Sequence, residues 1–554
     1  MFRPALPSSI PPKGWWNSSW FLTLMALAAA IPLIWPITPP LTDLPGHMGR
    51  YRVEISDPSS PLRQLYFGYE WRFLANLGVD IAIIPMARLF GLELGLKLIV
   101  IAIPVLMASG LLWTAREAHG RVTPPALFAL PLTYSFPFIW GFLNFSFSMA
   151  LALNAFALWL RLGRQGRFRL RNWLFVPIGI ALTVVHVFGW AVLCLLAYAA
   201  EVVRQRDQGQ GFWRSLWNGG WACLSIAPPI LLLLAWRASD QAAEGTSANA
   251  DFFFWRAKYI YLLSSLRTHW MVVDIAGVYL LWGLIAFGLG GVWVRMNRTL
   301  GIASLMLMIA YALLPRILLN SAYADMRLAP YVIAVGTIAL TLKSNVRWQS
   351  AAVAAAAVLF YAGRLAMLTV SFAHHDAANQ RQLEALDHIR PYSRVFVQAS
   401  LQCLSQWETT RMDHLGSMAI VRRGAFMNGQ WADPGAQLLV VKYVPPDDYD
   451  KDPSQILRPF RCRQADAKTF PEAVNALPRG AFDYVWLINL PQKSWASFPG
   501  LMPIWTGEKR GILYRVMPEH KYLPMPNLPR PPKKKRRAPG SDPAKIPTPK
   551  TDKL

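Results

Sequence analysis

Residues Trp20–Trp35, WFLTLMALAAAIPLIW, form an apolar run without a charged side chain, close to the roughly 20 residues that a helix needs to cross a bilayer. Similar runs recur as far as Phe372. The chain of 554 residues is 54% hydrophobic and contains 24 tryptophans, which is too apolar for an ordinary soluble enzyme. Ala28–Ala30 resembles a signal-peptidase site, but the apolar run continues beyond it, so we expect an uncleaved anchor. The sequence therefore predicts an α-helical polytopic membrane protein.

The net charge of +25 is spread over several short loops and is not gathered in one patch. This distribution argues against nucleic acid as a partner and follows the positive-inside rule, which places such loops in the cytoplasm. The basic residues of these loops are Arg116 and Arg121, then Arg161, Arg164, Arg167, Arg169 and Arg171, then Arg204, Arg206 and Arg214, then Arg295 and Arg298, and finally Lys343 and Arg347.

The basic loops fix the order of the spans by alternation. Leu174–Val203 is one apolar run between two basic loops, and a single tilted span would place one of those loops outside. We therefore expect a tight hairpin with His186 at its far tip. Spans are predicted near residues 19–37, 94–114, 124–141, 143–161, 173–186, 188–202, 216–236, 270–294, 299–318, 328–343 and 348–371. These are eleven spans, so an amino terminus inside, with Arg3 and Lys13, places the carboxyl terminus outside.

Composition divides the chain into four parts. We expect a cytoplasmic amino terminus at 1–18, a multi-span membrane domain at 19–372, an exported α/β domain at 373–522 and a disordered basic tail at 523–554, with external loops at 38–92 and 237–269. Within the first loop, the helical spacing of apolar residues in Leu74–Leu92 favours a helix that lies in the membrane interface. The basic Pro- and Lys-rich tail is typical of a solvated segment, with contact to anionic lipid or envelope polymer as the alternative.

The exported domain is expected to contain a helix at 379–389 and strands at 394–398, 437–443, 484–490 and 511–517. Two of the four cysteines, Cys403 and Cys462, fall in this domain. A disulfide between them would stabilise it by roughly 4 kcal/mol in an oxidising compartment. Two unpaired buried thiols are the alternative, and spacing leaves both interpretations open.

The strongest chemical pattern follows the first span, where Asp43, His47, Arg50 and Arg52 fall in ten residues. If a helix begins after Asp43, Pro45 occupies its permissive first turn, and Asp43, His47 and Arg50 lie close to one face. That face would suit an anion. In the alternative interpretation Asp43 only caps the helix and the arginines are ordinary charges next to the membrane.

The order of several short motifs resembles the GT-C superfamily of membrane glycosyltransferases over roughly residues 17–372. These motifs are Asp43 and His47 in Thr-Asp-Leu-Pro-Gly-His, Asn76 and Asp80 in Phe-Leu-Ala-Asn-Leu-Gly-Val-Asp, Trp140 to Phe145 in Trp-Gly-Phe-Leu-Asn-Phe, His186 at the hairpin tip, and Arg327 in Asp-Met-Arg-Leu-Ala-Pro. The resemblance implies a bacterial cytoplasmic membrane enzyme. Such an enzyme transfers a sugar from a polyprenyl-phosphate donor to a glycan, lipid or protein acceptor on the outer face, usually with inversion.

The same resemblance implies roles for individual residues. Asp43 matches the acidic residue that acts as general base in the first external loop. Arg327 matches the arginine before a late span and is the first candidate for the donor phosphate, with Arg50, His47 and His186 as further candidates. Snorkelling is the alternative for Arg327, and a helix-capping turn is the alternative for His186.

Metal dependence stays open at this stage. The superfamily sometimes holds a divalent ion, Mg²⁺ or Mn²⁺, with a second acidic residue in a later external loop. The corresponding segment Tyr134–Phe147 contains no acid, so Asp80 is the remaining candidate. Trp140, Phe142 and Asn144 in this segment are candidates for contact with isoprenoid or sugar, although an aromatic belt at the interface would also explain the two aromatic residues.

Two non-enzymatic functions compete with this interpretation. A glycan or lipid transporter should carry ionisable groups in the middle of its spans, and few are visible. An envelope assembly protein would use the α/β domain as a binding module, which shows none of the usual hydrolase or kinase signatures.

The predicted topology can be tested with reporter fusions. A reporter that is active only outside the cytoplasm should give a signal when it is fused after residue 522 and none when it is fused in the basic loop at Arg164. A carboxyl-terminal reporter that works only in the cytoplasm would contradict the odd number of spans, and the hairpin at His186 would be wrong.

Overall fold

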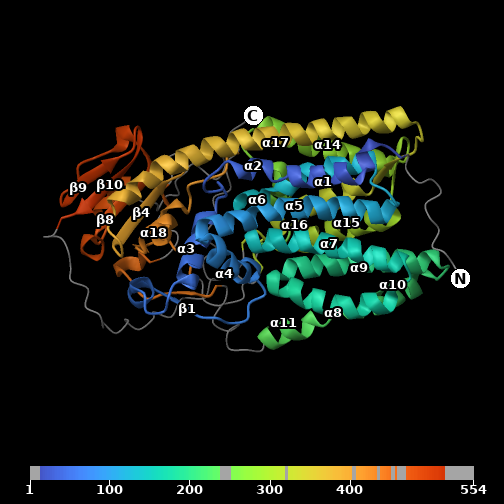
Figure 1. Cartoon of the computed structure of the whole chain (residues 1–554), viewed down its shortest axis with the longest axis horizontal. Helices are drawn as coiled ribbons and strands as arrows, with labels where there is room; N and C mark the ends of the chain where they lie inside the picture. Colours follow the sequence, from blue (N-terminus) through green and yellow to red (C-terminus); the bar gives the residue numbers. More distant parts are fainter. Residues whose placement is uncertain are drawn as a thin grey trace.

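The computed structural model describes residues 13–237, 251–318, 322–401, 407–432, 437–450, 456–457 and 470–517. A bundle of helices makes up one end of the molecule, and a smaller part with a β-sheet lies at the other end (Figure 1). The predicted disulfide partners Cys403 and Cys462 and the basic tail lie outside the described residues. Cys194 and Cys223, in the bundle, are free thiols.

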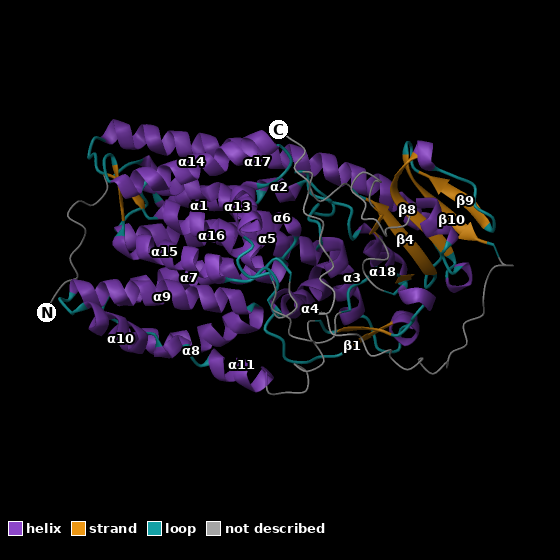
Figure 2. Ribbon diagram, turned by 180° about the vertical axis from the view of Figure 1, so that it is seen from behind, coloured by secondary structure: helices purple, strands orange, loops and turns teal. Residues whose placement is uncertain are grey.

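Six helices in the described part of the chain are long and apolar enough to cross a membrane. They are α5 (Leu92–His119), α7 (Leu143–Arg164), α8 (Phe168–Val185), α9 (Val187–Asp207), α14 (Met271–Gly290) and α17 (Arg347–Leu383). A seventh span is possible if α10 (Phe212–Ala222) and the segment η4 (Leu224–Ile226) with α11 (Pro229–Arg237) count as one helix bent by 42°. Each of these elements falls on a predicted span. The α8–α9 pair forms the expected hairpin, with His186 between the two helices (Figure 2).

The other predicted spans differ in length or type, so the total of eleven stays a prediction. Short helices occupy three of them: α1 (Ser19–Ala28) with α2 (Ile31–Ile34), α15 (Arg298–Leu313) and α16 (Ala324–Ile338). The expected helix at 124–141 is wrong, because the chain forms the 3₁₀ segment η3 (Pro124–Tyr134) and the short helix α6 (Phe136–Trp140). Prolines at 124, 125, 131 and 137 lack the amide hydrogens of an α-helix, and η3 is buried along its whole length, which shields its irregular backbone.

The small part is α/β, as predicted. Its sheet has the order β5-β4-β8-β10-β9, with β7 paired to β4. The strands are β4 (Arg394–Ser400), β5 (Phe426–Met427), β7 (Ile456–Leu457), β8 (Tyr484–Pro491), β9 (Leu501–Thr506) and β10 (Arg510–Val516), and the helices are α18 (Met418–Arg423) and α19 (Phe470–Asn475). Strand β4 is parallel to β5, β7 and β8, whereas β10 is antiparallel to both of its neighbours.

Two predicted elements of this part lie elsewhere. The strand expected at 437–443 is β6 (Leu439–Val441), and it pairs with β1 (Phe67–Tyr69) of the first external loop instead of joining the main sheet. The helix expected at 379–389 is the end of α17, followed by the 3₁₀ turn η6 (Glu384–His388). Helix α17 therefore runs without a break across the boundary predicted at residue 372.

The segment 38–92, predicted to be an external loop, packs onto the α/β part and forms one unit with it. Its helix α3 (Leu44–Ile55) packs against α18 and the turn η7 (Leu415–Ser417). The helix expected at Leu74–Leu92 is α4 (Gly78–Phe90), which packs against α5 and α7. The two-stranded β1–β6 ladder adds a second link between the loop and the α/β part. This packing brings residues from the two ends of the sequence to one end of the bundle.

The remaining described elements connect these layers. They are η1 (Trp15–Asn17), the π-type turn η2 (Leu62–Tyr66), α13 (Trp255–Leu263), η5 (Ser264–Leu266), β2 (Val294–Met296), β3 (Leu340–Leu342), η8 (Pro446–Asp448), η11 (Arg479–Ala481) and η12 (Gln492–Ser494). Strands β2 and β3 form an antiparallel pair at the end of the bundle away from the sheet (Figure 2).

A buried carboxylate joins three of these elements. Asp274, in the first turn of α14, accepts a hydrogen bond from Arg364 of α17 at 2.6 Å. It also accepts bonds from the backbone amide of Thr268 at 2.7 Å and from Nε1 of Trp407 at 2.7 Å. Asp274 and Arg364 are almost completely buried, so each charge depends on the other for its stabilisation.

Substitution of Arg364 by Met should destabilise the fold by about 3–5 kcal/mol, because it leaves the Asp274 carboxylate buried without its cation. Thermal unfolding of the protein in detergent would measure this change. Arg298→Ala is the control, since the Arg298–Asp207 pair is largely exposed and should contribute little. Equal effects of the two changes would contradict the structural importance of the Asp274 network.

Candidate active site

Asp43 lies at the point where the first external segment enters α3. It occupies the N-cap position, with Pro45 in the first turn, but its side chain makes no capping hydrogen bond. Its backbone amide instead donates to the carbonyl of Trp140 at 2.8 Å, which fixes Asp43 against the end of α6. The helix predicted after Asp43 is therefore confirmed. The backbone of Asp43 occupies the N-cap position, but its carboxylate does not cap the helix and is directed to other groups. Capping alone therefore does not explain this residue.

The backbone of Gly141 explains how Asp43 comes so close to α6. Gly141 has a φ of +106°, which side chains rarely adopt, and a Cβ placed there would lie 2.9 Å from the amide nitrogen of Asp43. The same glycine forms a backbone hydrogen bond with the imidazole of His47, one turn along α3. One residue without a side chain thus positions two of the predicted site residues.

His414 from the α/β part also reaches this point. Its Nε2 atom is 3.8 Å from Oδ1 of Asp43, and both side chains are largely buried. The His414 ring packs against the Trp431 ring, with 4.2 Å between the two ring centroids. The His47 ring also packs against Trp431, at a centroid distance of 5.1 Å. The indole can approach because α3 carries Gly46 there: a Cβ on Gly46 would lie 2.8 Å from the Trp431 ring. Asp43 therefore has an imidazole neighbour that the sequence did not suggest.

Arg327 faces the same site from the first turn of α16. Its guanidinium carbon is 4.2 Å from the ring centroid of Phe142. Its positive charge attracts the Asp43 carboxylate and disfavours protonation of His47 and His186. Nη2 donates to the carbonyl of Ala322 at 3.3 Å. The structure thus brings together the predicted base and the first candidate for the donor phosphate.

His186 has a capping role as well as a place in the site. Its Nδ1 atom accepts a hydrogen bond from the backbone amide of Phe188 at 3.2 Å at the start of α9. The ring also packs edge-on against Phe145 at 5.7 Å. Since Arg327 lies within range of a charge interaction, His186 belongs to the wall of the site, held in place by its cap.

Arg50 and Asp80 were candidates for binding phosphate and for a second catalytic acid, but they are partners of each other. They form a buried ion pair at 2.9 Å between α3 and α4. Asn144 donates to Asp80 at 3.1 Å and accepts a bond from the amide of Val79 at 2.6 Å, so it ties α7 to α4. These three side chains are used in packing the loop. The donor-binding role of Arg50, the metal role of Asp80 and the sugar contact of Asn144 stay predictions.

Trp140 and Phe142 remain at the edge of the site. Both are partly exposed, and their rings lie 6.2 Å apart. Trp140 also packs 5.6 Å from Tyr323, the residue before α16. Because Arg327 stacks on Phe142, an anionic group held by Arg327 would have apolar ring faces beside it.

Burial sets the charge state around α3. Burial lowers the pKa of His47 well below its ordinary value, with Arg50 and His414 acting in the same direction. Burial also raises the pKa of Glu54 to about 8, and the Asp80 carboxylate adds to this shift. For Arg50, burial acts to lower the pKa, but Asp80, Tyr51 and Tyr69 together outweigh burial and raise the value. At neutral pH the interior therefore holds a neutral His47, a protonated Glu54 and a paired Arg50.

A carboxylate, an imidazole and a guanidinium around one point can move a proton and hold an anion. Among the described residues, Asp43 and Asp80 are not part of a group that could hold a metal ion. Such a group does form from His269, His375 and Glu408.

Sequence reasoning missed His414 and Trp431. His414 lies just before η7 and Trp431 follows β5, and neither has a motif or a periodic pattern around it. The pair of glycines Gly46 and Gly49 on α3 is the one signal that was available. Small residues one turn apart on a helix permit a close neighbour, although they do not predict which residue that neighbour is.

No protein-family model and no curated protein sequence matches this chain. Among solved structures, the chain is similar to the crystal structure of ArnT from Cupriavidus metallidurans bound to undecaprenyl phosphate. The sequence identity is 13%, the match covers 91% of this chain and 99% of that one, and the TM-score is 0.47. This likeness is too low to assign a fold family or a function.

Gly141→Ala should destabilise the protein more than Gly166→Ala. Both glycines have a positive φ, so either alanine adds backbone strain of about 1–2 kcal/mol. Only the Cβ at position 141 would contact the Asp43 backbone, which should cost about 1–3 kcal/mol more. Thermal unfolding of the two variants in detergent measures the difference. Equal midpoints would mean that Asp43 is not held against α6 as described.

Proposed function

We propose that this chain is a membrane glycosyltransferase that moves a sugar from a polyprenyl-phosphate donor to an acceptor hydroxyl, with Asp43 as general base. The supporting observation is the convergence of Asp43, His414, Arg327 and His186 at one end of the bundle. These residues come from four distant parts of the sequence. Packing alone does not require a carboxylate, two imidazoles and a guanidinium to meet at one point, so their meeting favours a chemical role.

The proposed reaction is a single displacement. The Asp43 carboxylate takes the proton of the acceptor hydroxyl while its oxygen attacks the anomeric carbon. A new carbon–oxygen bond forms on one face of the sugar as the bond to the lipid phosphate breaks on the opposite face, so the configuration inverts. The bonding electrons leave with the phosphate oxygen. The proton is then on Asp43 and must pass to solvent before the next turnover.

Arg327 is proposed to stabilise the departing lipid phosphate. A phosphate dianion next to lipid is poorly solvated, and a guanidinium gives it charge-assisted hydrogen bonds. Arg327 stacks on Phe142 beside Trp140, so the isoprenoid chain would extend along these rings. His47 is neutral and hydrogen-bonded to Gly141, and it would offer a hydrogen bond to substrate without adding charge.

His414 is proposed to act on Asp43. At 3.8 Å its imidazole lies beyond hydrogen-bonding distance of the carboxylate but within range of a charge interaction, and a small rotation would let it accept the proton after transfer. Because His414 belongs to the α/β part, that part would complete the active site as well as contact the acceptor. The acceptor is proposed to be a hydroxyl group of a glycan, a lipid or a protein.

We also propose a cellular location for this protein. The helical bundle would span the cytoplasmic membrane of a bacterium, and the end that carries Asp43 and the α/β part would face outward. The buried ion pairs inside the bundle, such as Lys258–Asp325 at 3.1 Å and Arg171–Glu201 at 2.6 Å, do not favour a transporter, because each charge already has its partner.

Asp43→Asn should lower the rate of sugar transfer by at least about 100-fold, since the amide cannot accept the proton. The rate is measured in a reconstituted assay with a panel of polyprenyl-phosphate sugars. The control is Asp57→Asn, an exposed acid in the same external loop, which should retain activity. Insertion into the membrane should be normal for both variants.

The same assay separates an enzyme from a transporter. Transfer that continues in detergent supports catalysis, because transport needs two compartments. Full activity of the Asp43→Asn protein would contradict the general base, and movement of lipid-linked sugar across sealed vesicles without a new glycosidic bond would contradict the enzyme.

A further inference from the structure

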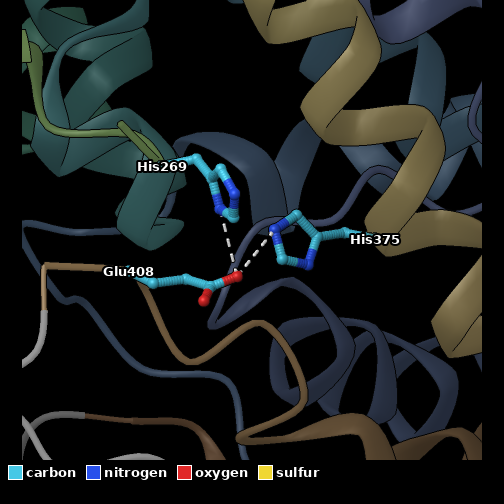
Figure 3. Close-up of side chains that lie close together, drawn as sticks. All are labelled: His269, His375 and Glu408. Carbon is cyan, nitrogen blue, oxygen red and sulfur yellow. Dashed lines mark ion pairs between the residues drawn. The ribbon is translucent and has the colours of Figure 1, made fainter. Parts of the chain in front are cut away.

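A second group of polar side chains lies near the α/β part, away from Arg327 and His186. His269 comes from the segment between η5 and α14, His375 from α17 beyond its membrane-length portion, and Glu408 from the segment that follows β4 (Figure 3). All three side chains are partly buried. Figure 3 shows both imidazole rings directed at the Glu408 carboxylate. Three elements far apart in the sequence thus converge on one point.

The distances match those around a bound metal ion. Nδ1 of His269 is 3.1 Å and Nε2 of His375 is 3.5 Å from the same oxygen of Glu408. The three ligand atoms all lie within 4.8 Å of one another. Atoms that each lie about 2.0–2.1 Å from a tetrahedral zinc ion are about 3.3 Å apart. The side chains would need only small rotations to hold such an ion.

The two imidazole nitrogens need a partner. His269 Nδ1 and His375 Nε2 are both shielded from solvent, and neither makes a hydrogen bond of acceptable geometry, even with the carboxylate so close. Buried polar atoms are normally satisfied, so two such atoms aimed at one oxygen require an explanation. A cation between them would satisfy both nitrogens and the carboxylate at once.

We propose that His269, His375 and Glu408 bind one divalent transition-metal ion, with Zn²⁺ as the preferred occupant. Two imidazoles and one carboxylate are a ligand set that suits zinc and related ions better than Mg²⁺ or Ca²⁺, which prefer oxygen. Three protein ligands leave a fourth position for water. Arg411, whose guanidinium lies over Phe372 one turn before His375, opposes the cation and should limit its affinity.

The ion would fix the segment that carries His414. Trp407 is already bound to Asp274, and Arg411 donates to the carbonyl of Pro40 at 2.6 Å, three residues before Asp43. Glu408 lies between these two anchors. An ion at Glu408 would therefore join α17 and the start of α14 to the segment that ends at His414. This positioning role rests on the proposed function, whereas metal binding itself does not.

Metal binding can be measured directly on the full-length protein in detergent. The protein, freed of metal with a chelator, is titrated with Co²⁺, whose visible absorption reports low-symmetry sites with imidazole ligands, and then with Zn²⁺. We expect one Co²⁺ per chain, displaced by one Zn²⁺. His375→Ala, His269→Ala and Glu408→Gln should each weaken binding by more than about 100-fold. His374→Ala is the matched control, because His374 is exposed and outside the group, and it should bind like the unaltered protein.

Hydrogen exchange supplies a second readout that a folding defect would not mimic. With Zn²⁺, the amides of residues 407–414 should exchange at least about tenfold more slowly in the unaltered protein and in His374→Ala, but not in Glu408→Gln. Absence of stoichiometric binding, or binding that survives all three substitutions, would overturn the site. Binding without slower exchange would overturn the positioning role. Asp43→Asn should bind Zn²⁺ normally, so loss of the glycosyltransferase proposal would leave the metal titration unaffected.

Discussion

The buried pair between Asp274 and Arg364 is the interaction on which the junction of the molecule depends. One carboxylate holds α14 to α17 and also accepts the indole hydrogen of Trp407. Two charges in a dry interior stabilise the fold only while both are present and correctly placed. The pair therefore fixes the relative position of the bundle and the segment that leads to His414. Together with the packing of α3 on α18 and η7 and the β1–β6 ladder, this junction holds side chains of the α/β part beside Asp43.

The candidate site is built from backbone contacts before it is built from side chains. The amide of Asp43 is bound to the carbonyl of Trp140, and its carboxylate makes no capping hydrogen bond to α3. Gly141 and Gly46 allow α6 and Trp431 to approach from two sides. Charges that would otherwise compete are paired elsewhere, as Arg50 is with Asp80. The groups that face the site are thus those with no essential role in holding the loop.

The α/β part also contributes side chains to the candidate site and to the proposed metal group. Its sheet is small and mixed, but the chain between β4 and β6 contributes His414 and Trp431 to the site, and Glu408 to the proposed metal group. Residues 407–414 contain no helix or strand that would keep them in place. Anchors at Trp407 and Arg411, with an ion at Glu408, would supply that order where it matters for Asp43.

The sequence by itself determined the class of architecture, most of the long apolar helices, the α8–α9 hairpin and the helix after Asp43, because periodicity and loop charge are local properties. It failed at 124–141, where prolines and complete burial replace a helix with a 3₁₀ segment. Only the tertiary structure decided that Arg50 and Asp80 neutralise each other and that His414 meets Asp43. Such pairings depend on which surfaces pack together, and no residue spacing along the chain encodes the contact of α3 with a segment more than 350 residues away.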